Sequence, residues 1–260
     1  ISKKDCTQYK EEMSKILSEM EQNQNNASFM YSLNTDKKIQ EDYVKKLWNS
    51  SETIDYFLEP NVLDENKKLK IDPDTNKPYE FSKAVCKIGH ALHMKNKVFY
   101  DLIWRDDCKR IFRDLGWKNP RVPQSMYICK NAKLGSAVEA HRDATFLYNP
   151  SDDNILTFDD NNDPKKHSPQ KTNDQENSNP GNNILGMWLA LDDANLQNGC
   201  LWAVKGSHNS RIPRRVYRNK TNDAMTEEGK DETYPENFWS PLEVSAGDLV
   251  LIHGDRKSTR

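Results

Sequence analysis

The pattern of apolar residues changes at about Pro120, and this change constrains the fold more than any other feature of the chain. Before Pro120, apolar side chains recur every three or four residues, which is the period of an amphipathic helix. After Pro120, short runs of β-branched and aromatic residues are separated by turn signals such as Gln197-Asn198-Gly199, which is typical of strands. We therefore expect a single domain that is mostly helical over residues 1–118 and forms sheets over residues 119–260.

Three stretches of the first half carry the helical period. A helix with one buried apolar stripe is predicted over residues 5–20, and a short helix over residues 39–48. Helical spacing returns at residues 81–92 and continues to Gly116, a residue type that commonly ends helices. Lys87 would then flank the apolar stripe of a helix.

The second half is predicted to contain five strands separated by turns. Residues 151–183, between the second and third of these strands, are rich in Asn, Asp, Lys and Pro and have few apolar side chains. Such a segment buries too little apolar surface to offset its ordering entropy, so we interpret it as a polar insertion in a single domain. The expected strands are Val122–Ile128, Thr145–Tyr148, Ile184–Leu191, Cys200–Val204 and Leu242–Ile252.

Charge and cysteine content narrow the class of protein. The 38 Lys and Arg nearly balance the 40 Asp and Glu, so no overall field favours nucleic acid or an anionic membrane as a partner. The five cysteines lie far apart without a C-x-x-C pair, which indicates reduced thiols and an intracellular, cytoplasmic protein, with the peroxisome as the alternative. No apolar run is long enough to span a bilayer, which predicts a protein without membrane insertion.

The triplet His141-Arg142-Asp143 is the main candidate for a functional site. On a strand, two side chains separated by one residue point to the same side. A neutral imidazole and a carboxylate are suitable ligands for Fe(II), and a set of two His and one carboxylate leaves positions open for a co-substrate and oxygen. The triplet would supply two of these three ligands.

Six motifs follow one another in order from about Tyr79 onward. They are Lys87-Ile88-Gly89-His90-Ala91-Leu92-His93, Gln124-Ser125-Met126-Tyr127-Ile128, His141-Arg142-Asp143-Ala144-Thr145-Phe146-Leu147-Tyr148, Asn198-Gly199-Cys200-Leu201-Trp202, Gly206-Ser207-His208 and Leu249-Val250-Leu251-Ile252-His253-Gly254. Together these motifs resemble the phytanoyl-CoA dioxygenase family, in particular its branch of domain-containing proteins. The polar insertion is the chief departure.

This resemblance implies a fold and a reaction. The implied fold is mainly β with flanking α: a double-stranded β-helix, the cupin-like jelly roll, with N-terminal helices packed on one sheet. The implied activity is that of a dioxygenase that uses Fe(II), O2 and 2-oxoglutarate, with ascorbate as a further candidate cofactor. Such an enzyme hydroxylates a small organic or lipid-like substrate while 2-oxoglutarate is decarboxylated to succinate and CO2.

The resemblance also assigns roles to individual residues. His141 and Asp143 would be iron ligands. The residues that would contact 2-oxoglutarate are Lys87, Met126, Trp188 and Arg260, with Arg256 as the competing choice for Arg260. The sequence alone offers another role for each of them: the lysine would be solvated, the methionine and the tryptophan would pack in the core, and the arginine would belong to a mobile basic tail.

The second iron-binding His of the family is missing at its expected place. In the family it follows a His-Gly-acid turn by a few residues, whereas here Asp255 is followed at once by Arg256. His253 lies earlier in this motif and is expected to serve packing or hydrogen bonding. Either residues are left out between Asp255 and Arg256, or the protein lost its third ligand. The second case would make it a non-catalytic jelly-roll binding module, and a sugar- or nucleotide-modifying enzyme of the cupin class is a third alternative.

Several polar residues have no firm role in this interpretation. His90 and His93 are expected to be hydrogen-bonded structural residues, and His208 either lies near the mouth of the site or caps a loop. A run of basic residues is expected to be a solvated loop, although it could attract an acidic or phosphorylated substrate. This run consists of Arg211, Arg214, Arg215, Arg218 and Lys220.

Overall fold

The computed structural model divides the chain into two compact units, residues 2–136 and residue 1 with residues 137–260. We refer to them as the N-terminal unit and the C-terminal unit. Three features of the sequence lie outside the described residues: the helix predicted at 39–48, the polar insertion and Arg260. The structure describes residues 1–22, 50–59, 62–66, 68–117, 119–147, 184–209, 214–218, 225–254 and 256–259.

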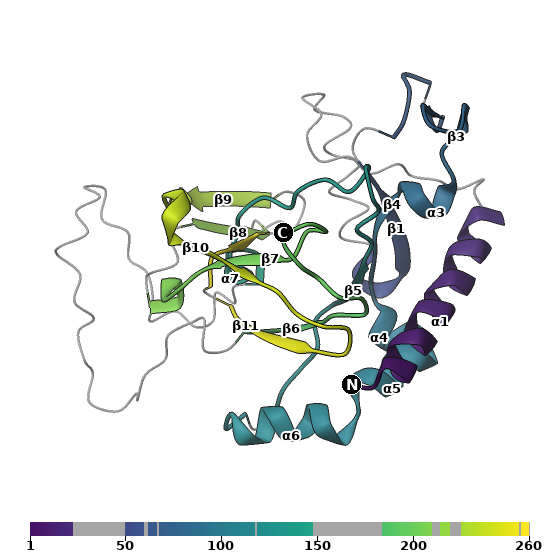
Figure 1. Ribbon diagram of the computed structural model, residues 1–260. Helices are drawn as coiled ribbons and strands as arrows, with labels where there is room; N and C mark the ends of the chain where they lie inside the picture. Colours follow the sequence, from purple (N-terminus) through teal and green to yellow (C-terminus); the bar gives the residue numbers. More distant parts are fainter. Residues whose placement is uncertain are drawn as a thin grey trace, which may run out of the picture. The chain divides into compact units, whose positions relative to one another are not determined.

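The N-terminal unit combines helices with a three-stranded antiparallel sheet of order β1-β4-β5 and a small β2-β3 hairpin (Figure 1). Its helical elements are α1 (Lys3–Gln22), η2 (Ser50–Glu52), α3 (Phe81–Ala84), α4 (Leu92–Lys95), α5 (Lys97–Ile103) and α6 (Asp106–Asp114). Its strands are β1 (Ile54–Leu58), β2 (Ile71–Asp72), β3 (Lys77–Pro78), β4 (Val85–His90) and β5 (Ser125–Ile128).

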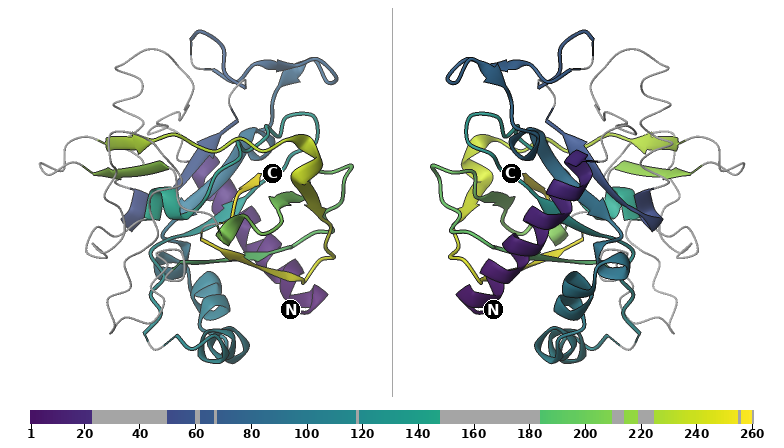
Figure 2. Two further views of the ribbon diagram at one scale, coloured as in Figure 1. Left: turned by 90° about the vertical axis from the view of Figure 1, so that its left-hand side faces the viewer. Right: turned by 90° about the vertical axis from the view of Figure 1, so that its right-hand side faces the viewer.

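The predicted N-terminal helix is confirmed as α1, which is one continuous helix in both views of Figure 2. Cys6, Tyr9, Met13 and Ile16 recur at steps of three and four residues and are at most 9% exposed. This stripe packs against α3 and α5, where the rings of Tyr9 and Phe99 lie with their centroids 6.2 Å apart. The apolar period of the sequence therefore identifies the buried face of this helix.

The helix predicted over residues 81–92 is wrong. The chain forms the single turn α3, then strand β4, then α4, so that Lys87 lies on a strand. β4 is the central strand of its sheet, and its backbone pairs with β1 on one side and β5 on the other. Val85 and Ile88 are both buried, on opposite faces of β4, and without an apolar-polar alternation a buried strand cannot be told from a helix by its spacing. The helical continuation as far as Gly116 is confirmed, because α5 and α6 follow, α6 ends at Asp114, and Gly116 directly after its C-cap Leu115 has a φ of +80°.

The described residues of the C-terminal unit form three small antiparallel sheets, β10-β7-β12, β11-β6 and β8-β9. β6 and β11 lie side by side along the lower part of this unit in Figure 1. Its helical elements are α7 (Ala144–Leu147), η4 (Ser207–Asn209) and η5 (Glu236–Phe238). Its strands are β6 (Leu185–Leu189), β7 (Leu201–Val204), β8 (Arg214–Arg218), β9 (Met225–Gly229), β10 (Trp239–Leu242), β11 (Leu249–His253) and β12 (Ser258–Thr259).

Some predictions for the C-terminal unit are wrong. A strand is expected at Thr145–Tyr148, but its described residues 145–147 belong to the short helix α7, in which the amides of Phe146 and Leu147 donate to the Asp143 carbonyl. No strand of the described residues pairs with this segment. The basic run is not a solvated loop where it is described, since Arg214 and Arg215 lie on β8 and Arg215 is only 8% exposed. Acidic residues of the neighbouring chain segments, which the local sequence does not reveal, pair with Arg214.

The architecture is a mixture of helices and several small antiparallel sheets, and the strands expected at 122–128, 184–191 and 200–204 are present as β5, β6 and β7. The single strand expected at Leu242–Ile252 is wrong, because β10 ends at Leu242, the chain turns at Gly247 with a φ of +98°, and β11 begins at Leu249. No helix in the described part of the chain is long and apolar enough to cross a membrane. Charged side chains are rarely buried unless they are paired. Three of them are nevertheless buried in the described part of the C-terminal unit, Arg142, Arg215 and Lys257, and such side chains require polar partners.

Candidate metal centre

Backbone hydrogen bonds hold the His141-Arg142-Asp143 triplet against the end of the described chain. His141 and Ser258 exchange two of them, with N–O distances of 2.9 and 3.0 Å, and the Ala144 amide donates to the Gly254 carbonyl at 3.0 Å. The triplet thus makes one strand-like bridge and leads directly into α7.

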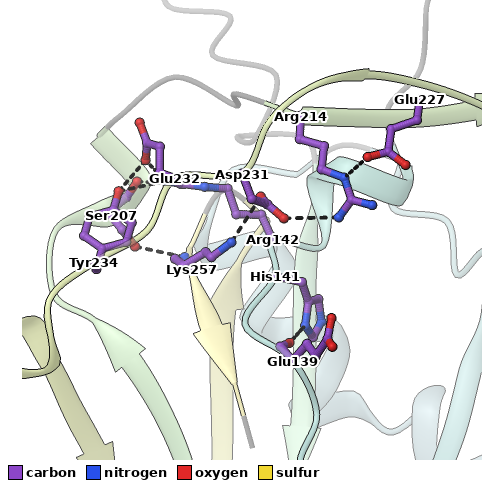
Figure 3. A network of polar contacts seen from close by, with 10 residues as sticks. All are labelled: Glu139, His141, Arg142, Ser207, Arg214, Glu227, Asp231, Glu232, Tyr234 and Lys257. Atoms are coloured by element: carbon purple, nitrogen blue, oxygen red, sulfur yellow. Dashed lines mark hydrogen bonds and ion pairs between the residues drawn. The ribbon is translucent and has the colours of Figure 1, made fainter. Parts of the chain in front are cut away.

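The side chains of His141 and Asp143 converge, as their spacing predicted. His141 Nε2 lies 3.5 Å from Asp143 Oδ1, and the side chains are 32% and 33% exposed. His141 Nδ1 donates to the Glu139 carbonyl oxygen at 2.8 Å (Figure 3). Because a carbonyl oxygen only accepts, the neutral imidazole carries its proton on Nδ1, and Nε2 keeps the lone pair that a metal needs.

The electrostatic environment of this pair favours a positive charge. The pKa of His141 is raised, first by its hydrogen bond to Asp143 and further by the Glu139 carbonyl, while burial acts against the shift. A cation bound at Nε2 in place of the second proton of the ring would be stabilised by the Asp143 carboxylate in the same way. Donor types, tautomer and local charge therefore all fit a divalent metal.

Gly186 and Trp188 lie on the strand beneath the carboxylate. A Cβ built on Gly186 would lie 3.1 Å from Asp143 Oδ2, so the carboxylate rests on β6 where there is no side chain. Residues two apart on a strand share a face, which puts the Trp188 side chain on the face that Asp143 covers. The structure therefore brings Trp188 to the same side of the β6-β11 ribbon as the triplet.

Lys87 and Met126 come together within the N-terminal unit. They lie on neighbouring strands, β4 and β5, and the register places both on one face of the sheet. The Met126 side chain fills the space above Gly89, where a Cβ would lie 2.9 Å from Met126 Cγ. Lys87 Nζ lies 4.3 Å from the centroid of the Phe57 ring, and burial lowers the pKa of Lys87. Lys87 is therefore not a solvated lysine.

The histidines of the N-terminal unit have structural hydrogen bonds, as expected. His90 Nδ1 lies 2.7 Å from Ser50 Oγ, and His93 Nδ1 lies 2.8 Å from Ser125 Oγ. Both pKa values are lowered by burial, that of His90 to about 4. These contacts support packing roles.

Residues 256–259 of the C-terminal unit are held by hydrogen bonds and burial rather than forming a free basic tail. Arg256 donates to the Val204 carbonyl at 3.0 Å and contacts His208 Nδ1 at 3.3 Å, and Lys257 is 3% exposed. The interpretation of residues 256–259 as a mobile tail is therefore wrong, because β12 pairs with β7. Within the described ranges, no group of three or more His, Cys, Asp or Glu side chains could hold a metal, so His141 and Asp143 stand there as two donors.

Sequence reasoning missed the buried polar network around the triplet (Figure 3). Arg142 is 0% exposed and binds Ser207, Glu232 and Tyr234, which are distant in the sequence. The available signal was the alternation itself: if His141 and Asp143 point to one side, Arg142 must point to the other. What it meets there could not be inferred from local sequence.

The C-terminal unit combines small antiparallel sheets with a His-x-Asp pair whose side chains converge and whose imidazole tautomer is fixed. These features are those of a sheet-rich protein with two donors suited to a metal. The family model described as phytanoyl-CoA dioxygenase (PhyH) matches residues 1–255, and the chain belongs to that family. Membership confirms the resemblance of the six motifs and places the chain in a family named for a dioxygenase, hence for an oxidoreductase.

Individual relatives agree with this assignment. The chain is 34% identical over 209 residues to "Phytanoyl-CoA dioxygenase domain-containing protein 1" of Mus musculus, a match that covers 80% of this chain and 59% of the relative. It is 33% identical over 229 residues to "Phytanoyl-CoA dioxygenase 1" of Oryza sativa subsp. japonica, covering 88% of this chain and 66% of the relative. The chain thus spans about three fifths of the length of the mouse relative.

Proposed function

We propose that this chain carries an Fe(II)- and 2-oxoglutarate-dependent dioxygenase centre that hydroxylates a small organic or lipid-like substrate. The observation that carries the proposal is the convergence of His141 Nε2 and Asp143 Oδ1 at 3.5 Å, above Gly186, in a chain of the PhyH family. We further propose that residues 1–260 form one catalytic domain built on a double-stranded β-helix.

His141 and Asp143 would hold the metal. When bound, iron together with 2-oxoglutarate and O2 supplies the oxidation, which yields succinate, CO2 and a hydroxylated product. The Glu139 carbonyl keeps His141 in the required tautomer, and Gly186 leaves room for the carboxylate. The third ligand, a second His, is not found with His141 and Asp143 among the described residues, and we propose that it belongs to a segment left out between Asp255 and Arg256.

The co-substrate roles are proposed for the residues that the family resemblance names. Lys87 would contribute a cation, Met126 and Trp188 a packing wall, and Arg260 or Arg256 a bidentate donor for a carboxylate. The burial of Lys87 against Phe57 supports this role, because a buried ammonium gains most from an anionic ligand. The Trp188 position on the Asp143 side of β6 supports a role next to the metal.

A non-catalytic binding module is the second candidate, because only two donors meet at the site in the part of the chain that the structure describes. Succinate formation from 2-oxoglutarate with added Fe(II) separates the two. We expect slow succinate formation without a hydroxylation substrate, abolished in both His141→Ala and Asp143→Ala, since a ligand set that loses a member holds iron weakly. Turnover at the wild-type rate in either variant would refute the metal assignment, and no turnover despite 2-oxoglutarate binding would favour the binding module.

A further inference from the structure

Arg142 is buried on the side of the triplet that faces away from the two candidate ligands. Its side chain is 0% exposed, whereas those of His141 and Asp143 are 32% and 33% exposed and meet each other. A guanidinium taken out of water must have partners, because the loss of its hydration is costly. The partners of Arg142 must therefore be strong hydrogen-bond acceptors.

Three acceptors from two distant segments hold the guanidinium (Figure 3). Nη1 donates to the Ser207 carbonyl at 2.7 Å, and Nη2 donates to Glu232 Oε2 at 2.8 Å and to the Tyr234 hydroxyl at 3.0 Å. The Tyr234 hydroxyl in turn donates to the same Glu232 oxygen. A planar guanidinium bound from two directions cannot rotate or slide without breaking several charge-assisted hydrogen bonds.

The acceptor segments are themselves fixed. The Trp239 indole donates to the Tyr234 carbonyl at 3.3 Å, which anchors the segment that carries Glu232. Ser207 Oγ accepts from the Lys257 amide at 2.9 Å. Lys257 directly precedes Ser258, the backbone partner of His141. The network thus reaches the triplet both through the Arg142 side chain and through the bridge at His141.

We propose that Arg142 is a positioning residue whose contacts with Ser207, Glu232 and Tyr234 set the angle and separation of the His141 and Asp143 side chains. A residue between two ligands controls both of them, since a rotation of its backbone turns both neighbouring side chains. The identification of the pair as a metal centre rests on the proposed function. The mechanical claim, that Glu232 and Tyr234 order residues 141–147, is tested independently of it.

The test changes the acceptors and keeps Arg142, because replacing Arg142 would take the donor away from the Ser207 carbonyl, Glu232 and Tyr234 at once. Glu232→Gln and Tyr234→Phe each weaken one contact with the guanidinium. Co(II), a spectroscopic substitute for Fe(II), is titrated into the metal-depleted full chain and followed by its visible absorption. We expect both variants to bind Co(II) roughly 10- to 100-fold more weakly and to change the Co(II) spectrum, as is usual when a group that orients a ligand is lost.

A second readout needs no metal. Amide hydrogen exchange of residues 141–147 is measured in the metal-free protein, where His141 and Ala144 donate to Ser258 and Gly254. We expect faster exchange of these amides in Glu232→Gln and Tyr234→Phe, with exchange in the N-terminal unit unchanged. Such a local effect is what a positioning role predicts and general destabilisation does not.

Matched control variants are available in the β8-β9 hairpin. The Tyr217 hydroxyl donates to Glu228 as the Tyr234 hydroxyl donates to Glu232, so Tyr217→Phe and Glu228→Gln remove a similar contact that does not involve Arg142. Equal effects in test and control variants, or none in Glu232→Gln and Tyr234→Phe, would overturn the proposal. If the wild-type protein shows no Co(II) binding that His141→Ala abolishes, the proposed function fails, and amide exchange still decides whether Arg142 positions the triplet.

Discussion

Gly186 lies directly beneath the carboxylate of Asp143, so close that a Cβ at position 186 would lie 3.1 Å from Asp143 Oδ2 and 3.3 Å from the Cβ of Ile252. Contacts of this length are tighter than packed interiors tolerate without a shift of the neighbours. The glycine therefore creates the space in which the carboxylate sits. It also explains how β6 and the triplet can approach each other within the C-terminal unit.

Gly186→Ala is expected to displace the Asp143 carboxylate and to weaken metal binding about tenfold or more, because overpacking typically costs about 1–3 kcal/mol and about 1.4 kcal/mol is tenfold. The measurement is a Co(II) titration of the metal-depleted protein. Met187→Ala serves as the control, since Met187 is adjacent but points to the other face of β6. Unchanged affinity in Gly186→Ala would show that the carboxylate is not used.

Asp231→Asn is expected to destabilise the protein by roughly 3 kcal/mol, the lower end of the range for a broken buried ion pair, since Asp231 is itself partly exposed. Lys257 is 3% exposed, and its Nζ lies 3.1 Å from Asp231 Oδ1. Without that carboxylate the buried ammonium loses its counter-charge. Urea unfolding measures the effect, and the double variant Asp231→Asn with Lys257→Met should regain part of the loss. No recovery in the double variant would mean that the Asp231 contact with Arg214 dominates.

His90 should make the stability depend on pH. It is 4% exposed, and its pKa is lowered from 6.5 to about 4 by burial and by Lys87, while Asp55 acts in the opposite direction. Between these two pH values the unfolded chain binds more protons than the native protein, so stability falls as the pH falls. The contribution of His90 is fully present above pH 6.5 and is lost progressively towards about pH 4.

The corresponding measurement compares urea unfolding of the wild type and His90→Gln at pH 8 and near pH 4.5. We expect the wild-type advantage to shrink by roughly 2 kcal/mol at the lower pH, because each unit of pKa shift corresponds to about 1.4 kcal/mol. His93 is present in both proteins, so its own titration cancels. A constant difference between the two proteins would mean that His90 is charged in the native state.

Lys87→Ala and Arg260→Ala are each expected to raise the concentration of 2-oxoglutarate needed for half-maximal succinate production far more than that of iron. The physical reason is that charge-assisted hydrogen bonds to a carboxylate are stronger than neutral ones. The titration is done at saturating iron and repeated for Arg256→Ala. A defect in Arg256→Ala alone would move the carboxylate role to Arg256, and no defect in any variant would place the co-substrate elsewhere.

The sequence was most informative where structure is local. The apolar stripe of α1 follows directly from its spacing, and the glycines expected at the end of a helix and in a turn, Gly116 and Gly199, have the positive φ values that favour glycine. The convergence of His141 and Asp143 likewise follows from their separation by one residue. Ordered motifs were enough to find the family, because they record residue types and order rather than contacts.

Tertiary structure decided the features that depend on partners distant in the sequence. β4 is a strand because β1 and β5 pair with its two edges, although its apolar spacing resembles that of a helix. Arg142 and Lys257 are buried because Glu232 and Asp231 come to meet their charges, whereas in the sequence they are two basic residues among 38. Local periodicity specifies which side of a segment a residue faces. The cost of burying a charge is offset only by a partner that the fold brings to the same side of the segment. For Arg142 that partner is Glu232, which is 90 residues away in the sequence.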